Sequence, residues 1–349
     1  MKPIRVAING FGRIGRAFAR LSSAGGGSTS GGHGRGIEIV AVNDLGSLEN
    51  LAYLLKYDTV YGRFSGKVAV SSGQLVIDGK EVKFFSEKDP ANLPWKDLHI
   101  DVVVESTGFF TDYERARAHI TAGARRVVIT APSSGVNGAT VLMGINEEKL
   151  ATCQISSNAS CTTNAVSPVI AILDEAIGIE KAILSTTHAY TASQSLVDGP
   201  ASARGGKDMR EGRAAAMNIV PTSTGAATAV AIAYEPLKNK FDGISLRVPV
   251  AAGSIADITF IAKRQTTREE VNEILRHATT NPRWMGIFFA TDEELVSSDI
   301  VGVPYASIAD LGMTRVVDGN LVKVLAWYDN EIGYTESLVR HVLATAKHV

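Results

Sequence analysis

One cysteine in the sequence has neighbours that could support nucleophilic chemistry. Cys161 lies in the stretch "SNASCTTNAV" (157–166), among small hydroxyl and amide side chains. The residues that follow it are apolar at helical spacing, so we expect a helix that starts at the cysteine. There the helix dipole and free N–H groups favour the thiolate and could hold an oxyanion. We therefore predict a lowered thiol pKa for Cys161, against the alternative of a buried, inert cysteine.

A histidine downstream could serve as the base. His188 ends the apolar run "ILSTTHAYT", and an imidazole can pair with a thiolate and move a proton near neutral pH. The sequence does not show that Cys161 and His188 touch, and a structural histidine is the alternative. Pro168, in the helical run after the cysteine, is expected only near the first turn of that helix. Cys153 is interpreted as a small apolar residue; its spacing from Cys161 allows a disulfide, but reduced thiols are the simpler interpretation.

A glycine-rich turn near the N-terminus points to a phosphate ligand. The sequence "GFGRIG" (10–15) directly follows the β-branched run Ile4–Asn9 and opens a run with helical character. In that context Gly10 and Gly12 let the backbone approach a pyrophosphate, and the N–H groups of the helix start point at it. The turn therefore predicts a dinucleotide site.

The next strand-like run indicates which dinucleotide is bound. It covers Ile37–Asp44, and the carboxylate of Asp44 can bind an adenosine ribose diol and would repel a 2'-phosphate. NAD is therefore favoured over NADP, with a plain turn residue as the alternative for Asp44. The Gly- and Ser-rich segment 22–36 lengthens the interval between turn and strand. We expect it to be a surface loop, with partner binding as the less favoured interpretation.

The order of the elements predicts two kinds of sheet. Two more apolar runs, "DVVVESTG" and "RRVVITAP", enclose a helical run, "TDYERARAHITAG". This alternation predicts an α/β, Rossmann-type domain with a parallel sheet. After about residue 160 the strands are longer with few helices between them, which predicts an α+β domain with a mostly antiparallel mixed sheet. Amphipathic helices are expected at "TTREEVNEILRHATT" and at the C-terminal "TESLVRHVLATAKHV".

Length and composition favour a two-domain globular protein. The chain has 349 residues, which is longer than a domain with a single core usually is. Of these residues 45% are hydrophobic and 20% are charged, as in an ordinary globular protein. A net charge of -1 gives no reason to expect nucleic acid or a membrane as partner, and no apolar run could span a bilayer. The two cysteines and seven histidines have no metal-site spacing. The N-terminus has strand and turn character rather than that of a secretion signal, so a cytoplasmic protein is expected.

Five motifs together carry a family resemblance. The stretches "INGFGRIGR", "SNASCTTN", "PTSTGAA", "LRVPV" and "WYDNEIGY", in this order, resemble phosphorylating glyceraldehyde-3-phosphate dehydrogenase. The resemblance runs from Ile4 to the last helix, and "SNASCTTN" is its most specific element. It implies a glycolytic, cytoplasmic and usually homotetrameric enzyme. It also implies an NAD-binding domain, residues 1–160 joined by the C-terminal helix 331–349, and a catalytic domain, residues 161–330.

The resemblance implies a mechanism and a set of cofactor contacts. Cys161 would attack the aldehyde of D-glyceraldehyde 3-phosphate, and His188 would act as base while hydride passes to NAD. Inorganic phosphate would then cleave the thioester on Cys161 and release 1,3-bisphosphoglycerate. Besides Gly10, Gly12 and Asp44, the positions that match cofactor contacts are Arg13, Ile14, Thr130 and Asn330.

This chemistry needs two anion pockets, one for the substrate phosphate and one for the attacking phosphate. Arginine forks, threonine hydroxyls and backbone N–H groups suit both. The resemblance assigns Ser160, Thr162, Thr224 and Gly225 to one pocket, and Thr191 and Arg247 to the other. The stretch "STGAA" is also a reasonable helix start, which would aim N–H groups at an anion. For Arg247, between "ISL" and "VPV", the alternative is a surface charge on a strand.

The sequence departs from the family at two places. Where the family often has a second cysteine four residues after the nucleophile, this chain has Ala165. The segment 199–212 is longer than usual; in the family it belongs to a loop near the neighbouring subunit's cofactor. Within it, Arg210 matches an anion-binding arginine of one branch, but another branch places that arginine at the position of Glu211. The Gly199–Pro200 pair agrees with the NAD-using branch.

Two other functions compete with this prediction. Erythrose-4-phosphate dehydrogenase has the same cysteine and histidine, but acts on a longer aldehyde and commonly releases the acyl group to water. An inactive NAD-binding or interaction protein would use segment 22–36 or the region near residue 205. The presence of Cys161, His188 and Arg247 argues against an inactive protein.

Overall fold

The chain folds into two compact units. The computed structural model describes residues 2–23, 36–201 and 208–349, so most of the predicted loop 22–36 and the centre of segment 199–212 lie outside the described residues. The first unit comprises Met1–Ser160 and Thr335–Val349, and the second comprises Cys161–Tyr334. Within the described residues, every helix is too short or too polar to cross a bilayer.

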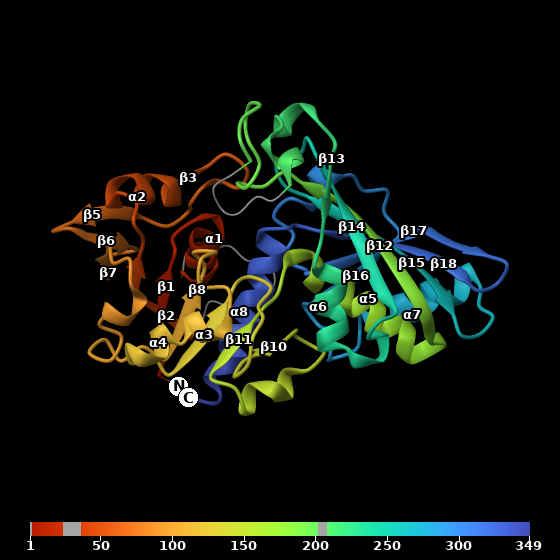
Figure 1. The fold of residues 1–349 in the computed structure, drawn as a ribbon, viewed down its shortest axis with the longest axis horizontal. Helices are drawn as coiled ribbons and strands as arrows, with labels where there is room; N and C mark the ends of the chain where they lie inside the picture. Colours follow the sequence, from red (N-terminus) through yellow and green to blue (C-terminus); the bar gives the residue numbers. More distant parts are fainter. Residues whose placement is uncertain (1, 24–35, 202–207) are drawn as a thin grey trace. The chain divides into compact units, whose positions relative to one another are not determined.

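The first unit is built on a nine-stranded sheet (Figure 1). Its strands, in spatial order, are β10 (Ala139–Thr140), β11 (Ile155–Ser157), β9 (Arg126–Ile129), β8 (Val102–Glu105), β1 (Ile4–Asn9), β2 (Ile37–Asn43), β7 (Lys80–Phe85), β6 (Gln74–Ile77) and β5 (Val68–Ser71). All neighbours from β10 to β7 are parallel. The predicted Rossmann-type sheet is thus confirmed. The antiparallel edge of β6 and β5 was not predicted, nor was the small ribbon of β3 (Tyr57–Asp58) and β4 (Gly62–Arg63).

Helices and apolar side chains complete this unit. Its helices are α1 (Arg13–Ser22), α2 (Leu48–Lys56), α3 (Tyr113–Ala116), α4 (Ala118–Thr121) and most of α8 (Ile332–Ala346), with 3-10 turns η1 (Pro90–Asn92) and η2 (Glu147–Ala151). Figure 1 shows α8, the last helix of the chain, beside strands of this sheet. Leu338 and Val342 of α8 join the core formed around Ile8 and Phe18. The C-terminal segment therefore returns to the first unit.

The second unit has a seven-stranded mixed sheet. Its strands, in spatial order, are β13 (Val220–Ser223), β14 (Phe241–Val248), β12 (Ile179–Ala189), β15 (Ser254–Ala262), β18 (Leu321–Tyr328), β17 (Ser307–Val317) and β16 (Phe288–Thr291). The pairs β12–β14 and β16–β17 are parallel and the other four are antiparallel. The α+β prediction is therefore confirmed. The helices are α5 (Cys161–Ile177), α6 (Ala226–Ala233) and α7 (Arg268–Ala278), with 3-10 turns η3 (Met209–Gly212), η4 (Ala215–Met217), η5 (Glu235–Leu237) and η6 (Ser297–Ile300).

One face of this second sheet is covered. Along β15 every second side chain, from Ser254 to Ala262, is buried, while the residues between them are half-buried. Helix α5 packs against β12, β15 and β18, which places its start near the end of β12. His188 and Arg247 are direct neighbours on β12 and β14, and the burial of His188 places it on the covered face.

The prediction that Pro168 would lie near the first turn of its helix is wrong. Helix α5 begins at Cys161, so Pro168 is well inside it. A proline there removes one intrahelical hydrogen bond and costs about 3 kcal/mol in an exposed helix. Helix α5 is almost entirely buried from Thr162 to Leu173, and this apolar burial offsets the local cost.

Candidate active site

The structure brings the predicted nucleophile and base into contact. Cys161 is the first residue of α5, and His188 lies one residue before the end of β12. The Sγ of Cys161 is 3.3 Å from Nε2 of His188, within the distance for a sulfur hydrogen bond. The pair therefore lies within the second unit, at the junction of a helix start and a strand end, as triad-like sites require.

Arg247 is the third member of this group. Its Nη1 lies 2.6 Å from Nδ1 of His188, and the same Nδ1 is 2.7 Å from the carbonyl oxygen of Ala189. The two partners demand opposite states of the ring, because a guanidinium only donates and a carbonyl only accepts. Donation from Nδ1 to Ala189 leaves Nε2 free to accept the proton of Cys161. Donation from Arg247 to Nδ1 instead puts the ring proton on Nε2, facing the sulfur.

The electrostatics contradict the expected thiolate. Burial raises the pKa of the Cys161 thiol, and the charge of Arg247 and hydrogen bonds from Thr162 oppose that rise only in part. Burial also lowers the pKa of His188 to about 3, and Arg247 acts in the same direction. The prediction of a lowered thiol pKa is therefore wrong for this structure, because desolvation outweighs the helix start. Both shifts favour a neutral thiol and a neutral imidazole, the form in which His188 can accept a proton.

A tyrosine that the sequence analysis did not single out braces this pair. The hydroxyl of Tyr328 lies 2.9 Å from Oγ1 of Thr162 and 2.8 Å from Oγ1 of Thr186. Its ring meets that of His188 edge-on at 5.9 Å. The only signal in the sequence is the inward phase of Tyr328 in the alternating strand "LVKVLAWY". The Thr162 hydroxyl is therefore engaged by Tyr328, and its place in an anion pocket stays a prediction.

The other predicted anion residues lie at the ends of three different elements of the second unit. Thr191 follows β12, and its hydroxyl lies 3.0 Å from that of Ser193. Thr224 and Gly225 immediately precede α6, and the Thr224 hydroxyl accepts from the N–H of Ala226. This geometry agrees with the expected helix start. Ser160 directly precedes α5.

Arg210 differs from the other predicted anion residues. It lies in η3 and is exposed, and its guanidinium donates to the carboxylate of Asp208 at 2.7 and 2.8 Å. Within the described part of the chain, its guanidinium makes no hydrogen bond or ion pair with Cys161 or His188. Its assignment to an anion pocket stays a prediction.

The glycine turn in the first unit has room for a phosphate. Gly12 precedes α1, which has no side-chain cap and no acidic residue in its first turn. A Cβ on Gly12 would meet open space, whereas one on Gly10 would lie 2.6 Å from the backbone of Ser106 and Thr107. The turn is thus tightly backed on one side and open on the other. A helix start that is open on this side suits the pyrophosphate of a dinucleotide.

The remaining predicted cofactor contacts are held by local bonds. One Asp44 oxygen accepts from the N–H of Phe11 at 2.7 Å, which ties the strand end to the glycine turn. Arg13 donates to Asp58, and Ile14 packs against the apolar core. The N–H of Thr130 donates to the backbone carbonyl of Glu105. Asn330, in the second unit, accepts from the Ser254 hydroxyl at 3.0 Å. Gly10 has a φ of +92°, a conformation that favours glycine.

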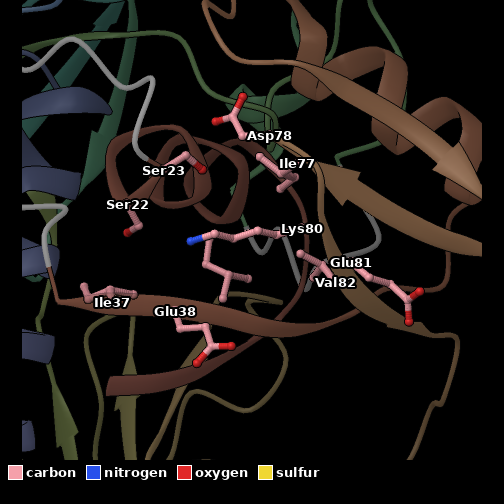
Figure 2. Close-up of a pocket in the computed structure, with 10 residues that line it drawn as sticks. Ser22, Ser23, Ile37, Glu38, Ile77, Asp78, Lys80, Glu81 and Val82 are labelled. Atoms are coloured by element: carbon pink, nitrogen blue, oxygen red, sulfur yellow. The ribbon is translucent and has the colours of Figure 1, made fainter. Parts of the chain in front are cut away.

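Two further features of the structure concern metal binding and a pocket outside the predicted site. Among the described residues, no group of three or more His, Cys, Asp or Glu side chains is arranged to hold a metal ion. A separate pocket of about 90 Å³ lies in the first unit, between the end of α1, β2 and the β6–β7 hairpin. Figure 2 shows the ammonium of Lys80 extending across this pocket toward Ser22. Its lining includes none of the predicted site residues.

Comparisons with known proteins identify the family. Residues 4–113 match the model of the glyceraldehyde 3-phosphate dehydrogenase NAD binding domain, and residues 160–330 match that of the C-terminal domain. "Glyceraldehyde-3-phosphate dehydrogenase 2" of Streptomyces avermitilis is 47% identical over 96% of both chains. Proteins named glyceraldehyde-3-phosphate dehydrogenase from Clostridium pasteurianum and Zymomonas mobilis are 46% and 44% identical, over 98% and 99% of both chains. These names do not favour the erythrose-4-phosphate alternative.

The structure and the comparisons agree on both halves of the chain. The half that matches the NAD binding domain contains the open glycine turn, and the half that matches the C-terminal domain contains the Cys161–His188 contact. The chain belongs to the glyceraldehyde-3-phosphate dehydrogenase family and is an NAD-dependent oxidoreductase.

Proposed function

We propose that Cys161 and His188 carry out the phosphorylating oxidation of D-glyceraldehyde 3-phosphate to 1,3-bisphosphoglycerate. The observation that carries this assignment is the 3.3 Å contact between Sγ and Nε2 at the start of α5. Since both groups are neutral in this structure, His188 accepts the thiol proton as the sulfur attacks C1 of the aldehyde. His188 then returns that proton to the former carbonyl oxygen, and with the new C–S bond this gives a thiohemiacetal.

The next two steps use the same pair. His188 takes the hydroxyl proton of the thiohemiacetal as the hydride leaves C1, which oxidises the carbon to a thioester. When bound, NAD is the acceptor of that hydride. An oxygen of inorganic phosphate then attacks the thioester carbon, and the C–S bond breaks with the electron pair on sulfur. The N–H groups at the start of α5 stabilise the oxyanion of both tetrahedral intermediates.

The anion contacts are part of the same proposal. Arg247 supplies the guanidinium nearest to the reacting pair, since its Nη1 is 2.6 Å from His188. The predicted set for the two phosphates is Ser160, Thr162, Thr191, Arg210, Thr224, Gly225 and Arg247. The cofactor set is Gly10, Gly12, Arg13, Ile14, Asp44, Thr130 and Asn330. Residues 1–160 with 331–349 serve the cofactor, and residues 161–330 serve the substrate.

The proposal extends to assembly and location. The sheet face of the second unit that lies opposite α5 exposes Ile183 and Ile244, at 62% and 53% of their surface. Apolar side chains on an uncovered sheet face favour association with another chain, and family membership favours a second copy of this one. The proposed assembly is therefore a homotetramer, which sedimentation would test. The proposed location is the cytoplasm, which cell fractionation would test. A monomer at micromolar concentration would contradict the assembly.

Two cysteine variants test the catalytic assignment. Cys161→Ala removes the nucleophile, so phosphate-dependent NADH production should fall by at least about 10⁴-fold. The matched control is Cys153→Ala, which removes the other free thiol and should keep the wild-type rate within about twofold. His188→Asn should slow the reaction by about 10²- to 10⁴-fold. More than a trace of activity in Cys161→Ala would refute the mechanism.

The same assay separates the substrate alternatives. The values of kcat/KM for glyceraldehyde 3-phosphate and erythrose 4-phosphate are compared, with and without inorganic phosphate. We expect strict phosphate dependence and preference for the shorter aldehyde. Phosphate-independent turnover of the longer aldehyde would favour the alternative enzyme, and no NADH signal with either would favour an inactive protein.

A further inference from the structure

A chain of buried polar side chains lies directly behind the glycine turn of the first unit. Glu105 ends β8 and is 2% exposed, and His119 of α4 is fully buried. The Nε2 of His119 is 2.9 Å from Oε2 of Glu105. Neither residue belongs to the proposed catalytic or cofactor set, so burial of this pair calls for another explanation.

The hydrogen bonds fix the protonation state of the histidine. The indole Nε1 of Trp95 lies 3.0 Å from Nδ1 of His119, and an indole N–H can only donate. Nδ1 must therefore accept, which leaves the ring proton of a neutral imidazole on Nε2. That proton then points at Glu105, so His119 is a donor to the carboxylate.

A second set of bonds fixes the asparagine on the other side. The N–H of Glu87 donates to Oδ1 of Asn43 at 2.8 Å, so Nδ2 of Asn43 is the donor to Oδ1 of Asn9 at 2.7 Å. The Nδ2 of Asn9 therefore faces Glu105, at 2.5 Å from Oε2. The backbone of Glu87 sets both amide orientations, and Asn9 becomes a second donor.

The other oxygen of Glu105 is also surrounded by donors. The N–H and the hydroxyl of Thr107 lie 2.8 and 2.5 Å from Oε1. With His119 and Asn9 on Oε2, four donors face the carboxylate. Each carboxylate oxygen of Glu105 therefore has two hydrogen-bond partners, although the side chain is buried.

These bonds join the two segments that form the cofactor turn. Asn9 is the last residue of β1 and precedes Gly10, while Thr107 follows β8 by two residues. The hydroxyl of Ser106 donates to the carbonyl of Gly10 at 2.6 Å. A Cβ on Gly10 would lie 2.6 Å from the Thr107 nitrogen, so the two segments touch. Glu105 binds one side through Asn9 and the other through Thr107.

We propose that Glu105 is a positioning residue for the cofactor: its buried carboxylate, held by Asn9, Thr107 and His119, fixes the glycine turn in its dinucleotide-binding geometry. This inference rests on the dinucleotide site proposed above. Glu105 acts through Asn9 and Thr107. Its loss should therefore weaken binding of NAD and leave the chemistry at Cys161 largely intact.

The test is NAD binding by the full-length protein, measured by calorimetry, together with steady-state kinetics. Glu105→Gln replaces one acceptor oxygen with an NH₂ group, which must face at least one of the donors. We expect the Kd and KM for NAD to rise about tenfold or more. The kcat at saturating NAD should stay within about threefold, and the aldehyde KM should not change. A general structural defect would also change kcat or the KM for the aldehyde.

A compensating variant sharpens the test. His119→Gln keeps an N–H near the position of Nε2, so its NAD affinity should stay within about threefold of wild type. In the double variant with Glu105→Gln, the amide of residue 119 can turn its oxygen toward residue 105. The change in log Kd for NAD should be at most half as large in the double variant as in Glu105→Gln alone. Additive losses would contradict the donor–acceptor argument.

Two more variants cover the remaining outcomes. Tyr113→Phe removes another buried hydrogen bond of the first unit, 3.2 Å to Thr140, and should lower the Tm without changing the NAD Kd. If Glu105→Gln does not fold, His119→Phe removes one donor and should raise the Kd about fivefold. An unchanged Kd in whichever of these two variants folds would overturn the inference. Failure of the wild-type protein to bind NAD would instead refute the proposed cofactor site.

Discussion

His341 is fully buried in the first unit, where Nδ1 lies 3.0 Å from Asn158 and Nε2 lies 2.8 Å from Ser156. Burial lowers the pKa of His341 to about 3. The unfolded chain has an ordinary histidine pKa of about 6.5. A depressed folded pKa contributes stability that is complete above about pH 6.5 and is lost as the pH falls toward 3.

The magnitude follows from these two pKa values. Between pH 7.5 and pH 5.0 the unfolded ring takes up a proton over about 1.5 pH units while the folded ring stays neutral. At about 1.4 kcal/mol per unit, the loss is about 2 kcal/mol. This result does not depend on the exact folded pKa, provided that it stays below about 4. The corresponding shift in Tm is about 3 to 5 °C, depending on how much of the chain melts together.

The assay compares wild type with His341→Gln by thermal melting at both pH values. Glutamine keeps a donor and an acceptor for Asn158 and Ser156 but does not titrate. Carboxylates titrate in both proteins, so the difference between their Tm values isolates His341. We expect wild type to lose about 3 to 5 °C more than the variant on acidification. A Tm difference that stays the same at both pH values would refute the claim that His341 is neutral when folded.

Three further predictions concern the proposed sites. Gly10→Ala should lower the Tm and weaken NAD binding, because its Cβ would lie 2.6 Å from the Ser106 backbone at a φ of +92°. Gly12→Ala is the control: its Cβ would meet open space, so its Tm should equal that of wild type. Equal Tm values for the two variants would contradict the geometry. Iodoacetamide labelling of Cys161 in the ligand-free protein should keep accelerating above pH 8.5, since burial raises its pKa; a plateau below pH 8 would show a thiolate instead. Tyr328→Phe should cost about 2 kcal/mol of stability through two lost hydroxyl bonds, and an unchanged denaturation midpoint would argue against the brace.

Local patterns in the sequence were sufficient for most of the fold. The parallel strands are short apolar runs separated by helices, so their alternation indicates a Rossmann-type sheet without knowledge of distant contacts. The edge strand β5 is largely exposed, and β6 alternates half-buried and buried residues, so neither resembles the continuously buried runs of the parallel strands. The position of Pro168 could not be predicted, because it depends on the buried surroundings of the whole of α5.

The candidate site divides in a similar way. Cys161 and His188 stand out by their motifs, and the expected helix start at the cysteine is where α5 begins. The thiol pKa was predicted in the wrong direction, because burial is a property of the folded chain and outweighs the helix dipole. The contact between Arg247 and His188 joins two strands far apart in the sequence. Only the register of β12 against β14 reveals it.

The buried hydroxyl of Tyr328 also gives the second unit an optical signature. Burial raises its pKa above the usual tyrosine range, and it is one of nine tyrosines in the chain. Phenolate formation changes the ultraviolet absorbance of a tyrosine, so in strong alkali this ring remains spectroscopically silent after ordinary surface tyrosines have ionised. The pKa values of Tyr113 and Tyr234 are also raised, so the part of the late signal that Tyr328→Phe abolishes is the part that marks the entry of water at the junction of α5 and the sheet. The side chain that braces the nucleophile thus also reports when that junction opens.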